Sequence, residues 1–205
     1  FSEKRITKQS YDDIFKNLSQ FGFKIKNTTY QLKINSDINP LIRVEIDDLL
    51  QIQEYCQTNE FPTYASFVEK TQLLKDNKPS YNEDFGFRTS IQEEKKHNIE
   101  SNSVLNMKEK WQSSLKTFRY LYRTSLVNDL MPNIRVDMSV LRTNSYDGKS
   151  INKSYNFADS NILNELPFCE VEIEIIDVKN IDKNDFINVI EHQLKKTIKY
   201  IISAI

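Results

Sequence analysis

The chain has 205 residues, of which 39% are hydrophobic and 28% are charged, a balance typical of a globular protein. Its 28 basic and 29 acidic residues give a net charge of −1, so any electrostatic function depends on local segregation of charge. The 3 glycines form no dinucleotide-binding or P-loop motif, and the 2 cysteines and 2 histidines lack the spacing of a zinc site.

Amphipathic helices are expected near the two ends of the chain. Thr7 suits a helix N-cap and Gly22 suits the end of that helix, and the apolar residues between them share one helical face. Residues 182–205 repeat apolar side chains at helical spacing and predict the second helix.

Most of the chain between these helices is predicted to form β-strands. The strands are expected over residues 29–34, 41–46, 66–72, 84–92, 115–127, 133–143 and 169–178, with a short helix over 49–56 and a loop or weak helix over 93–114. The order of a helix, many strands and a helix favours an α+β fold with a large antiparallel sheet or barrel.

The last predicted strand, "CEVEIEIIDV", carries Glu170, Glu172 and Glu174 on one face and apolar residues on the other. Neighbours on one face of a strand lie roughly 6.6–7 Å apart. Three carboxylates at this spacing repel one another unless a cation lies among them, and all-oxygen ligands suit Mg²⁺ or Mn²⁺. The alternative is a solvent-facing edge strand, where alternating Glu and Ile is common.

Other predicted strands also separate ionic from apolar residues. The ionic residues are Arg43 and Glu45, Arg88, Arg119 and Arg123, and Arg135 and Asp137. In a closed antiparallel barrel such faces would line the interior. Arginines suit phosphate oxygens, so arginines facing a divalent cation predict phosphoryl-transfer chemistry.

Segments across nearly the whole chain resemble the RNA triphosphatase domain of mRNA capping enzymes from large DNA viruses, the giant-virus type in particular. That domain belongs to the triphosphate tunnel metalloenzymes. The segments are "RITKQSYDDIFKNLSQFGF", "IRVEIDDLLQIQEYCQTN", "FGFRTSIQEE", "KTFRYLYR", "IRVDMSVLRTNS", "CEVEIEI" and "LKKTIKYIISAI". They follow the family's order, and the pairing of "IRVDMSVLRTNS" with "CEVEIEI" is the most specific part.

The resemblance implies an eight-stranded antiparallel β-barrel, the triphosphate tunnel, with flanking helices. It implies a single domain over residues 1–205 that forms the N-terminal part of a larger capping enzyme. The activity implied is metal-dependent removal of the γ-phosphate from 5′-triphosphate RNA, the first step of mRNA capping, with Mg²⁺ or Mn²⁺ as cofactor.

The resemblance also assigns site residues by position. The metal ligands would be Glu170, Glu172 and Glu174. The catalytic group would be Glu172, Glu174, Asp137 and Arg135, in which the arginine contacts phosphate and the aspartate positions basic groups or water. The substrate-binding cations would be Arg43, Lys70, Arg88, Arg119, Arg123 and Arg142.

Two departures from the family pattern concern the same site. The family's first strand carries a Glu-x-Glu pair, whereas only Glu3 precedes Thr7 here, so that strand is expected upstream of Phe1 unless this copy is inactive. The basic strand of the fungal relatives is Arg-x-Lys-x-Arg, and Leu121 takes the central position here.

Two other functions remain open. The chain could hydrolyse tripolyphosphate or nucleoside triphosphates with the same tunnel chemistry, or it could be a degenerate, non-catalytic tunnel module. For the enzyme, the expected partners are triphosphate-ended RNA and guanylyltransferase and methyltransferase domains downstream in the same chain. We expect a monomeric isolated domain in the host cytoplasm at the viral factory, with the virion as a second location. No apolar run approaches the roughly 18 residues that a membrane span needs.

Overall fold

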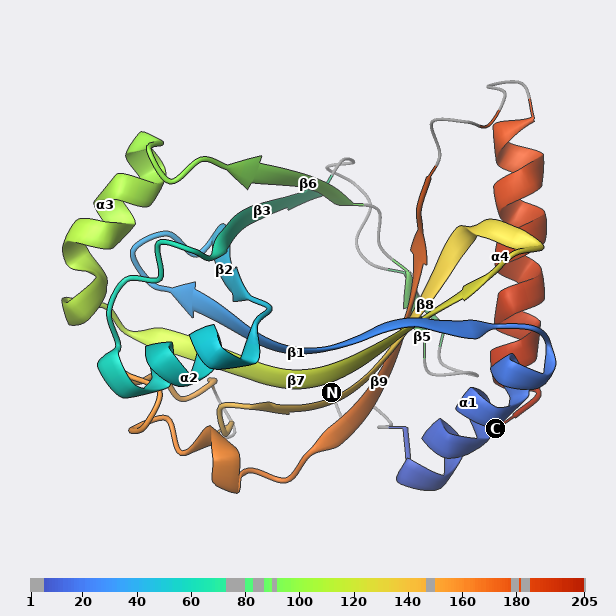
Figure 1. The fold of residues 1–205 in the computed structure, drawn as a ribbon, viewed down its shortest axis with the longest axis horizontal. Helices are drawn as coiled ribbons and strands as arrows, with labels where there is room; N and C mark the ends of the chain where they lie inside the picture. The colour runs from blue at the N-terminus through green and yellow to red at the C-terminus, as the bar shows by residue number, and fades with distance from the viewer. Residues whose placement is uncertain are drawn as a thin grey trace. The chain divides into compact units, whose positions relative to one another are not determined.

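The computed structural model describes residues 6–72, 80–82, 87–89, 92–146, 150–177, 181 and 185–204, without the side chains of residues 72, 80–82 and 87–89. The helices are α1 (Lys8–Gln20), α2 (Leu49–Thr58), α3 (Asn102–Lys110) and α4 (Phe186–Ile202), with 3-10 turns η1 (Trp111–Ser113) and η2 (Ile162–Asn164). The strands are β1 (Lys24–Ser36), β2 (Ile42–Ile46), β3 (Ser66–Gln72), β4 (Ser80–Asn82), β5 (Phe87–Thr89), β6 (Gln92–His97), β7 (Lys116–Asn128), β8 (Met131–Thr143) and β9 (Phe168–Ile175) (Figure 1).

Seven strands form one sheet in the order β6-β3-β2-β1-β7-β8-β9, and β4 pairs with β5 in a separate two-stranded sheet. The pairs β1–β2, β2–β3, β3–β6 and β8–β9 are antiparallel. The α+β class and the antiparallel sheet are therefore confirmed. The number of strands differs from the expectation. Eight strands were expected, and seven form the main sheet of the described residues.

The region expected to be a loop or weak helix explains part of this difference. Residues 93–97 belong to β6, so the expectation of a loop was wrong there, whereas α3 confirms the helix. The side chains of residues 92–96 are exposed on both faces of β6. A strand without a buried face has no apolar alternation, which is why the sequence pattern missed it. The expected strand over 84–92 is described only at β5 and at Gln92, which belongs to β6.

The chain divides into two compact units. Unit 1 comprises Phe1–Thr29, Tyr122–Leu141 and Pro167–Ile205, and unit 2 comprises Tyr30–Leu121 and Arg142–Leu166. Strands β1, β7 and β8 each contribute residues to both units. Whether the whole chain behaves as the single domain expected from the sequence stays a prediction.

The core of unit 1 lies between the sheet and helices α1 and α4. Buried residues of α1, including Ile14 and Leu18, pack with Val136 and Met138 of β8, and α1 also contacts α4 and β9. On β9, Val171 and Ile173 pack against the same cluster. Because strand side chains alternate between faces, the residues between these apolar positions point away from the two helices.

Helix α1 begins and ends where the sequence predicts. The Thr7 hydroxyl oxygen accepts a hydrogen bond from the Ser10 amide at 3.0 Å and so caps the first turn. Gly22 follows the helix with a φ of 88°, a left-handed conformation that glycine adopts without a steric penalty. The Phe23 amide then donates to the Leu18 carbonyl at 3.0 Å, which completes the C-terminal cap.

The core of unit 2 is built on β1, β2 and β3. Ile42, Val44 and Ile46 of β2 are buried and pack with residues of α2, α3 and η1, among them Tyr55 and Trp111. Arg43 and Glu45 alternate with these apolar residues and are half-buried on the other face of β2. The separation of ionic from apolar residues predicted for this strand is therefore confirmed.

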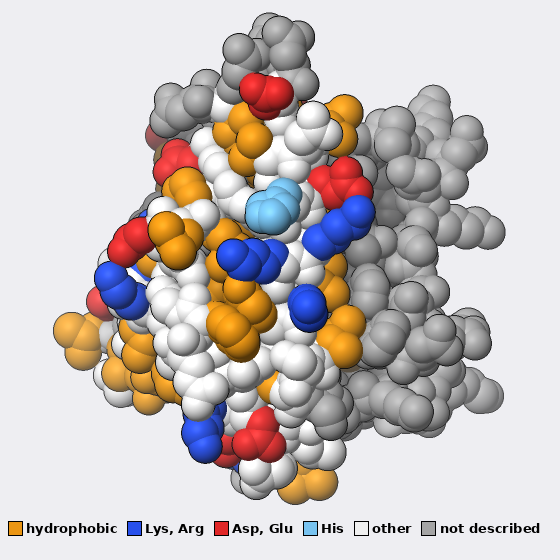
Figure 2. All heavy atoms as spheres, turned by 90° about the vertical axis from the view of Figure 1, so that its right-hand side faces the viewer, with side chains coloured by type: hydrophobic (Ala, Val, Ile, Leu, Met, Phe, Trp, Pro, Cys, Tyr) orange, Lys and Arg blue, Asp and Glu red, His pale blue; other side chains and the backbone are white. Residues whose placement is uncertain are grey.

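The exposed face of α4 is polar apart from Ile187 near its start. His192, Lys195, Lys196 and Lys199 are exposed, and Lys195 pairs with Glu191 one turn away. Figure 2 views this side of the molecule and shows basic and acidic side chains scattered among apolar ones. Among the described residues, no helix is both long and apolar enough to cross a membrane.

Candidate active site

Strands β8 and β9 bring charged residues from two distant segments together in unit 1. Their antiparallel register sets Arg135 opposite Glu174, Asp137 opposite Glu172, and Ser139 opposite Glu170. The apolar residues between them pack against α1 and α4. The charged side chains consequently share the face of β8 and β9 that these helices leave uncovered. We call it the ionic face.

Three carboxylates on this face converge. Oxygens of Asp137, Glu172 and Glu174 all lie within 4.8 Å of one another, which is the spacing of atoms that could share one cation. The Asp137 side chain is fully buried, whereas those of Glu172 and Glu174 are 40% and 39% exposed. The group thus has a buried anchor and two carboxylates that solvent or a ligand can reach.

Two arginines pair with these carboxylates. Arg123 Nη1 lies 3.2 Å from Asp137 Oδ2, and Arg123 Nη2 lies 2.5 Å from Glu172 Oε2. Arg135 Nε donates to Asp137 Oδ2 at 3.1 Å, and Arg135 Nη2 donates to Glu174 Oε2. Each guanidinium therefore bridges Asp137 and one glutamate, and Asp137 is common to both pairs.

Two buried serines complete the network. Ser125 Oγ donates to Asp137 Oδ1 at 2.7 Å, so both oxygens of this buried carboxylate have partners. Ser139 Oγ accepts from Arg123 Nε at 3.2 Å. A buried carboxylate whose two oxygens both accept hydrogen bonds is held in one orientation, and it orients the arginines in turn.

The electrostatics of the group show crowded negative charge. Burial raises the pKa of Glu174 above its usual value; Arg135 opposes this rise, and the neighbouring carboxylates Asp137 and Glu172 add to it. Such repulsion is relieved by a cation. Three carboxylates at this spacing fit Mg²⁺ or Mn²⁺, which bind oxygen ligands and retain several waters.

The structure therefore brings together five of the residues predicted from the sequence: Arg123, Arg135, Asp137, Glu172 and Glu174. In the structure, the third converging carboxylate is that of Asp137. The sequence had predicted Glu170 as the third metal ligand. Glu170 is half-buried opposite Ser139 and is not a member of the converging group among the described residues.

Arg43 and Lys70 lie in a second charged group, within unit 2. Arg43 Nε donates to Glu45 Oε1 at 2.6 Å, and the buried Lys33 has its Nζ 3.9 Å from the same oxygen. Lys70 pairs with Glu94. Burial alone would raise the pKa of Glu94, but the contact with Lys70 and the charges of Arg43 and Lys33 lower it.

The remaining predicted cations have separate positions. Arg142 Nε donates to the carbonyl of Glu165 at 2.9 Å in unit 2. Arg119 is half-buried on β7 in unit 2. The side chain of Arg88 and all of Glu3 lie outside the described residues, so these two assignments stay predictions.

Sequence analysis did not single out Ser125, Ser139 or Lys33. A signal for the serines was present, because Ser125 follows Arg123 by two residues and Ser139 follows Asp137 by two. Residues two apart on a strand share a face, so both hydroxyls had to lie on the ionic face. A serine on a strand is common without such a role, and its partners appear only in three dimensions.

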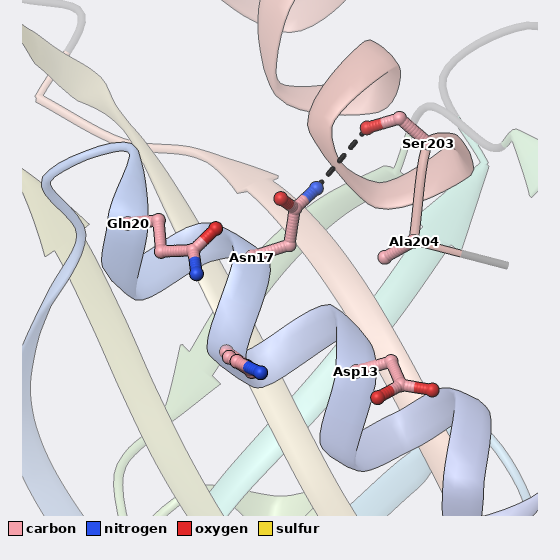
Figure 3. Close-up of a pocket in the computed structure, with 6 residues that line it drawn as sticks. Asp13, Asn17, Gln20, Ser203 and Ala204 are labelled. Carbon is pink, nitrogen blue, oxygen red and sulfur yellow. Dashed lines mark hydrogen bonds between the residues drawn. The ribbon is translucent and has the colours of Figure 1, made fainter.

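A shallow depression of about 200 Å³ lies between α1 and α4, lined by Asp13, Lys16, Asn17, Gln20, Ser203 and Ala204 (Figure 3). Asn17 crosses it, with Nδ2 donating to the Tyr200 carbonyl and to Ser203 Oγ. It lies on the helical side of β8 and β9, away from the ionic face, and contains none of the predicted site residues. We therefore assign it a packing role.

Comparison with known proteins identifies the fold. No protein-family model and no curated protein sequence matches the chain. Among solved structures, the RNA triphosphatase domain of a trifunctional mimivirus mRNA capping enzyme matches with a TM-score of 0.61 and 17% identity. This chain shares the fold of that triphosphatase domain.

Two further crystal structures of the mimivirus capping enzyme triphosphatase give the same result. The monoclinic form matches with a TM-score of 0.60 and 17% identity, and the triclinic form with 0.59 and 16%. Each of the three matches covers 97% of this chain and 86% of the other. The resemblance in fold therefore extends over almost all of the sequence.

Proposed function

We propose that this chain is a metal-dependent RNA triphosphatase, which removes the γ-phosphate from 5′-triphosphate RNA as the first step of mRNA capping. The observation that carries the proposal is the convergence of three carboxylates and two arginines in unit 1. The fold shared with the mimivirus RNA triphosphatase domain supports it.

The carboxylates provide the metal site in this proposal. Glu172 and Glu174 are the accessible ligands, and Asp137 is the buried third. A bound Mg²⁺ or Mn²⁺ would neutralise negative charge on the phosphate oxygens. Glu170 stays a predicted metal ligand on the same strand, two residues before Glu172.

The arginines bind the phosphate chain. The Arg135 side chain is 28% exposed, so its guanidinium can reach a ligand on the ionic face while Nε stays on Asp137. Guanidinium groups match phosphate oxygens with two parallel hydrogen bonds. Held by Asp137 and Ser139, the two arginines are positioned before the substrate arrives, which favours stabilisation of the charge that develops during transfer.

Glu174 is the group suited to accept a proton from the attacking water. Its exposed position allows a water to approach, in contrast to the fully buried Asp137. The water would attack the γ-phosphorus in line with the leaving oxygen.

The experiment is a phosphate-release assay on the purified protein with and without Mn²⁺ or Mg²⁺. Triphosphate-ended RNA, inorganic tripolyphosphate and ATP are compared as substrates. Metal-dependent release that is fastest on RNA supports the proposal. Faster release from tripolyphosphate or ATP would assign the same site to a small-molecule triphosphatase. Folded protein that releases phosphate from none of the three would leave a non-catalytic tunnel module.

The biological setting is also proposed. The structural neighbours come from an enzyme described as trifunctional in mRNA capping. We propose that this chain likewise acts beside guanylyltransferase and methyltransferase activities in the host cytoplasm. Transfer of a guanylate to RNA by the complete protein, only after γ-phosphate removal, is the corresponding measurement.

A further inference from the structure

We infer that Arg123 and Arg135 compete with the divalent cation for the carboxylates of Asp137, Glu172 and Glu174. The consequence is that metal binding and phosphate binding strengthen each other. This inference rests on the proposed function, because it concerns the same cation and the same phosphate. It goes beyond the proposed function, because it predicts that two substrate-binding arginines determine the affinity of the site for the metal.

Shared atoms are the first part of the argument. Every carboxylate in the converging group already accepts a hydrogen bond from a guanidinium: Glu172 from Arg123, Glu174 from Arg135, and Asp137 from both. Because the oxygens of the group that face one another are also close to the guanidinium nitrogens, a cation placed among them lies next to two positive charges. Like charges at such distances repel strongly in a half-buried site.

The charge balance is the second part. Three carboxylates and two guanidinium groups carry one net negative charge when all are ionised. A divalent cation turns this into one net positive charge, which an incoming phosphate group then offsets. The site therefore reaches a balanced charge only with both ligands, and each ligand improves the site for the other.

The exposed fractions of the paired side chains indicate which arginine can exchange its carboxylate for a phosphate oxygen. Arg135 is 28% exposed, and its glutamate partner Glu174 is 39% exposed, so this pair can open toward solvent. Arg123 is 9% exposed and is held by Asp137 and Ser139, so it turns less freely. We therefore assign the larger part of the coupling to Arg135, which can leave Glu174 for a phosphate oxygen.

The test measures Mn²⁺ affinity by titration calorimetry without any nucleotide. Arg135→Gln removes the competing charge and keeps a polar side chain. We expect its Mn²⁺ dissociation constant to fall about five- to tenfold relative to the wild type. Arg123→Gln should change affinity in the same direction, and its thermal unfolding is recorded because the residue is buried. Lys195→Gln, which removes one exposed positive charge from α4, is the control for net charge and should leave the constant unchanged.

A second arm repeats the titrations in inorganic phosphate. In the wild type, phosphate should lower the Mn²⁺ dissociation constant, because the arginines gain the anion as they release the carboxylates. In Arg135→Gln, the decrease in the Mn²⁺ dissociation constant that phosphate causes should be several-fold smaller. Linkage requires the reciprocal effect, so Mn²⁺ should raise the wild-type affinity for phosphate by the same factor.

The outcomes separate this inference from the proposed function. Equal or weaker Mn²⁺ binding by a folded Arg135→Gln protein overturns the competition, even if phosphate release from RNA remains metal-dependent. Tighter binding with a reduced phosphate effect supports it, even if the preferred triphosphate substrate is not RNA. Absence of Mn²⁺ binding by the wild-type protein overturns both the competition and the metal dependence.

Discussion

Arg123 Nη1 lies 3.2 Å from Oδ2 of Asp137, and both side chains are buried in unit 1. A buried ion pair is costly to desolvate and is stable only when its remaining hydrogen-bonding groups are satisfied. Here Ser125, Ser139, Glu172 and Arg135 satisfy them. The pair thus belongs to a network that joins three strands of the sheet, β7, β8 and β9, on the ionic face.

Asp137→Asn tests how much this network stabilises unit 1. The substitution keeps the size of the side chain but removes the charge that two guanidinium groups share. Breaking a buried pair from one side costs about 3–5 kcal/mol, so the free energy of unfolding should fall by that order. Urea unfolding measures the loss.

Asp129→Asn is the matched control. Asp129 pairs with Lys24 at 3.0 Å, but its side chain is 82% exposed. Exposed pairs contribute about 0–1 kcal/mol, so the control should be close to the wild type. Equal effects of the two substitutions would contradict the role assigned to Asp137.

Individual glutamate substitutions test which carboxylates hold the metal. Glu172→Gln and Glu174→Gln should each lower metal-dependent phosphate release by ~100-fold or more, because each removes an accessible ligand charge. Glu170→Gln should lower it by only about 10-fold, the smaller end of the effect of groups beyond the direct ligands, since Glu170 is outside the converging group. Rates at saturating Mn²⁺ and Mg²⁺ provide the measurement. A loss in Glu170→Gln as large as in the other two would restore the ligand set first predicted from the sequence.

Much of the fold could be predicted from the sequence because its signals are local. The strand predicted over residues 66–72 is β3, and the ends of α1 follow from Thr7 and Gly22. Prediction failed at β6, whose polar residues are exposed on both faces. It also extended the last strand to residue 178, whereas β9 ends at Ile175 and Asp177 adopts a left-handed backbone.

The sequence was sufficient to predict which charged residues form the site, but not which of them contact one another. Alternation placed Glu172, Glu174, Arg135 and Asp137 on the ionic faces of their strands, and the register of β8 with β9 confirms these faces. The register itself is a long-range property, so the sequence could not show that Asp137 lies opposite Glu172 rather than Glu170. For the same reason it could not show that Ser125 holds Asp137.

Gly22→Ala tests the left-handed cap of α1. An added Cβ would meet Asn128 Nδ2 at 3.5 Å, which is ordinary contact, so the cost comes from the φ of 88° alone. We expect the free energy of unfolding to fall by about 1 kcal/mol. Gln20→Ala, at the exposed end of the same helix, is the control and should change stability by less than ~0.5 kcal/mol. A fall well above the expected value would point to a clash with Asn128.

The buried Lys116 offers a test of stability against pH in unit 2. Its Nζ donates to the carbonyls of Trp111, Ser114 and Tyr155 at 2.6, 3.1 and 2.7 Å, and it lies 4.8 Å from the centre of the Trp111 ring. Burial lowers the pKa of Lys116 to about 8, although the charge of Asp37 opposes this. The unfolded chain keeps the ordinary value of about 10.4.

Between these two pKa values the unfolded chain holds a proton that the folded protein has released, so the free energy of unfolding should rise with pH across this interval. The rise attributable to Lys116 is about 3 kcal/mol. Lys116→Met should lack it and should be less stable at neutral pH by about 2–4 kcal/mol, because two buried carbonyls and one partly buried carbonyl lose their donor. The difference in unfolding free energy between wild type and Lys116→Met isolates this residue from the other groups that titrate at high pH. If this difference stays constant from neutral pH to about pH 10, the hydrogen bonds to the three carbonyls stabilise the charged form of Lys116 more than burial destabilises it.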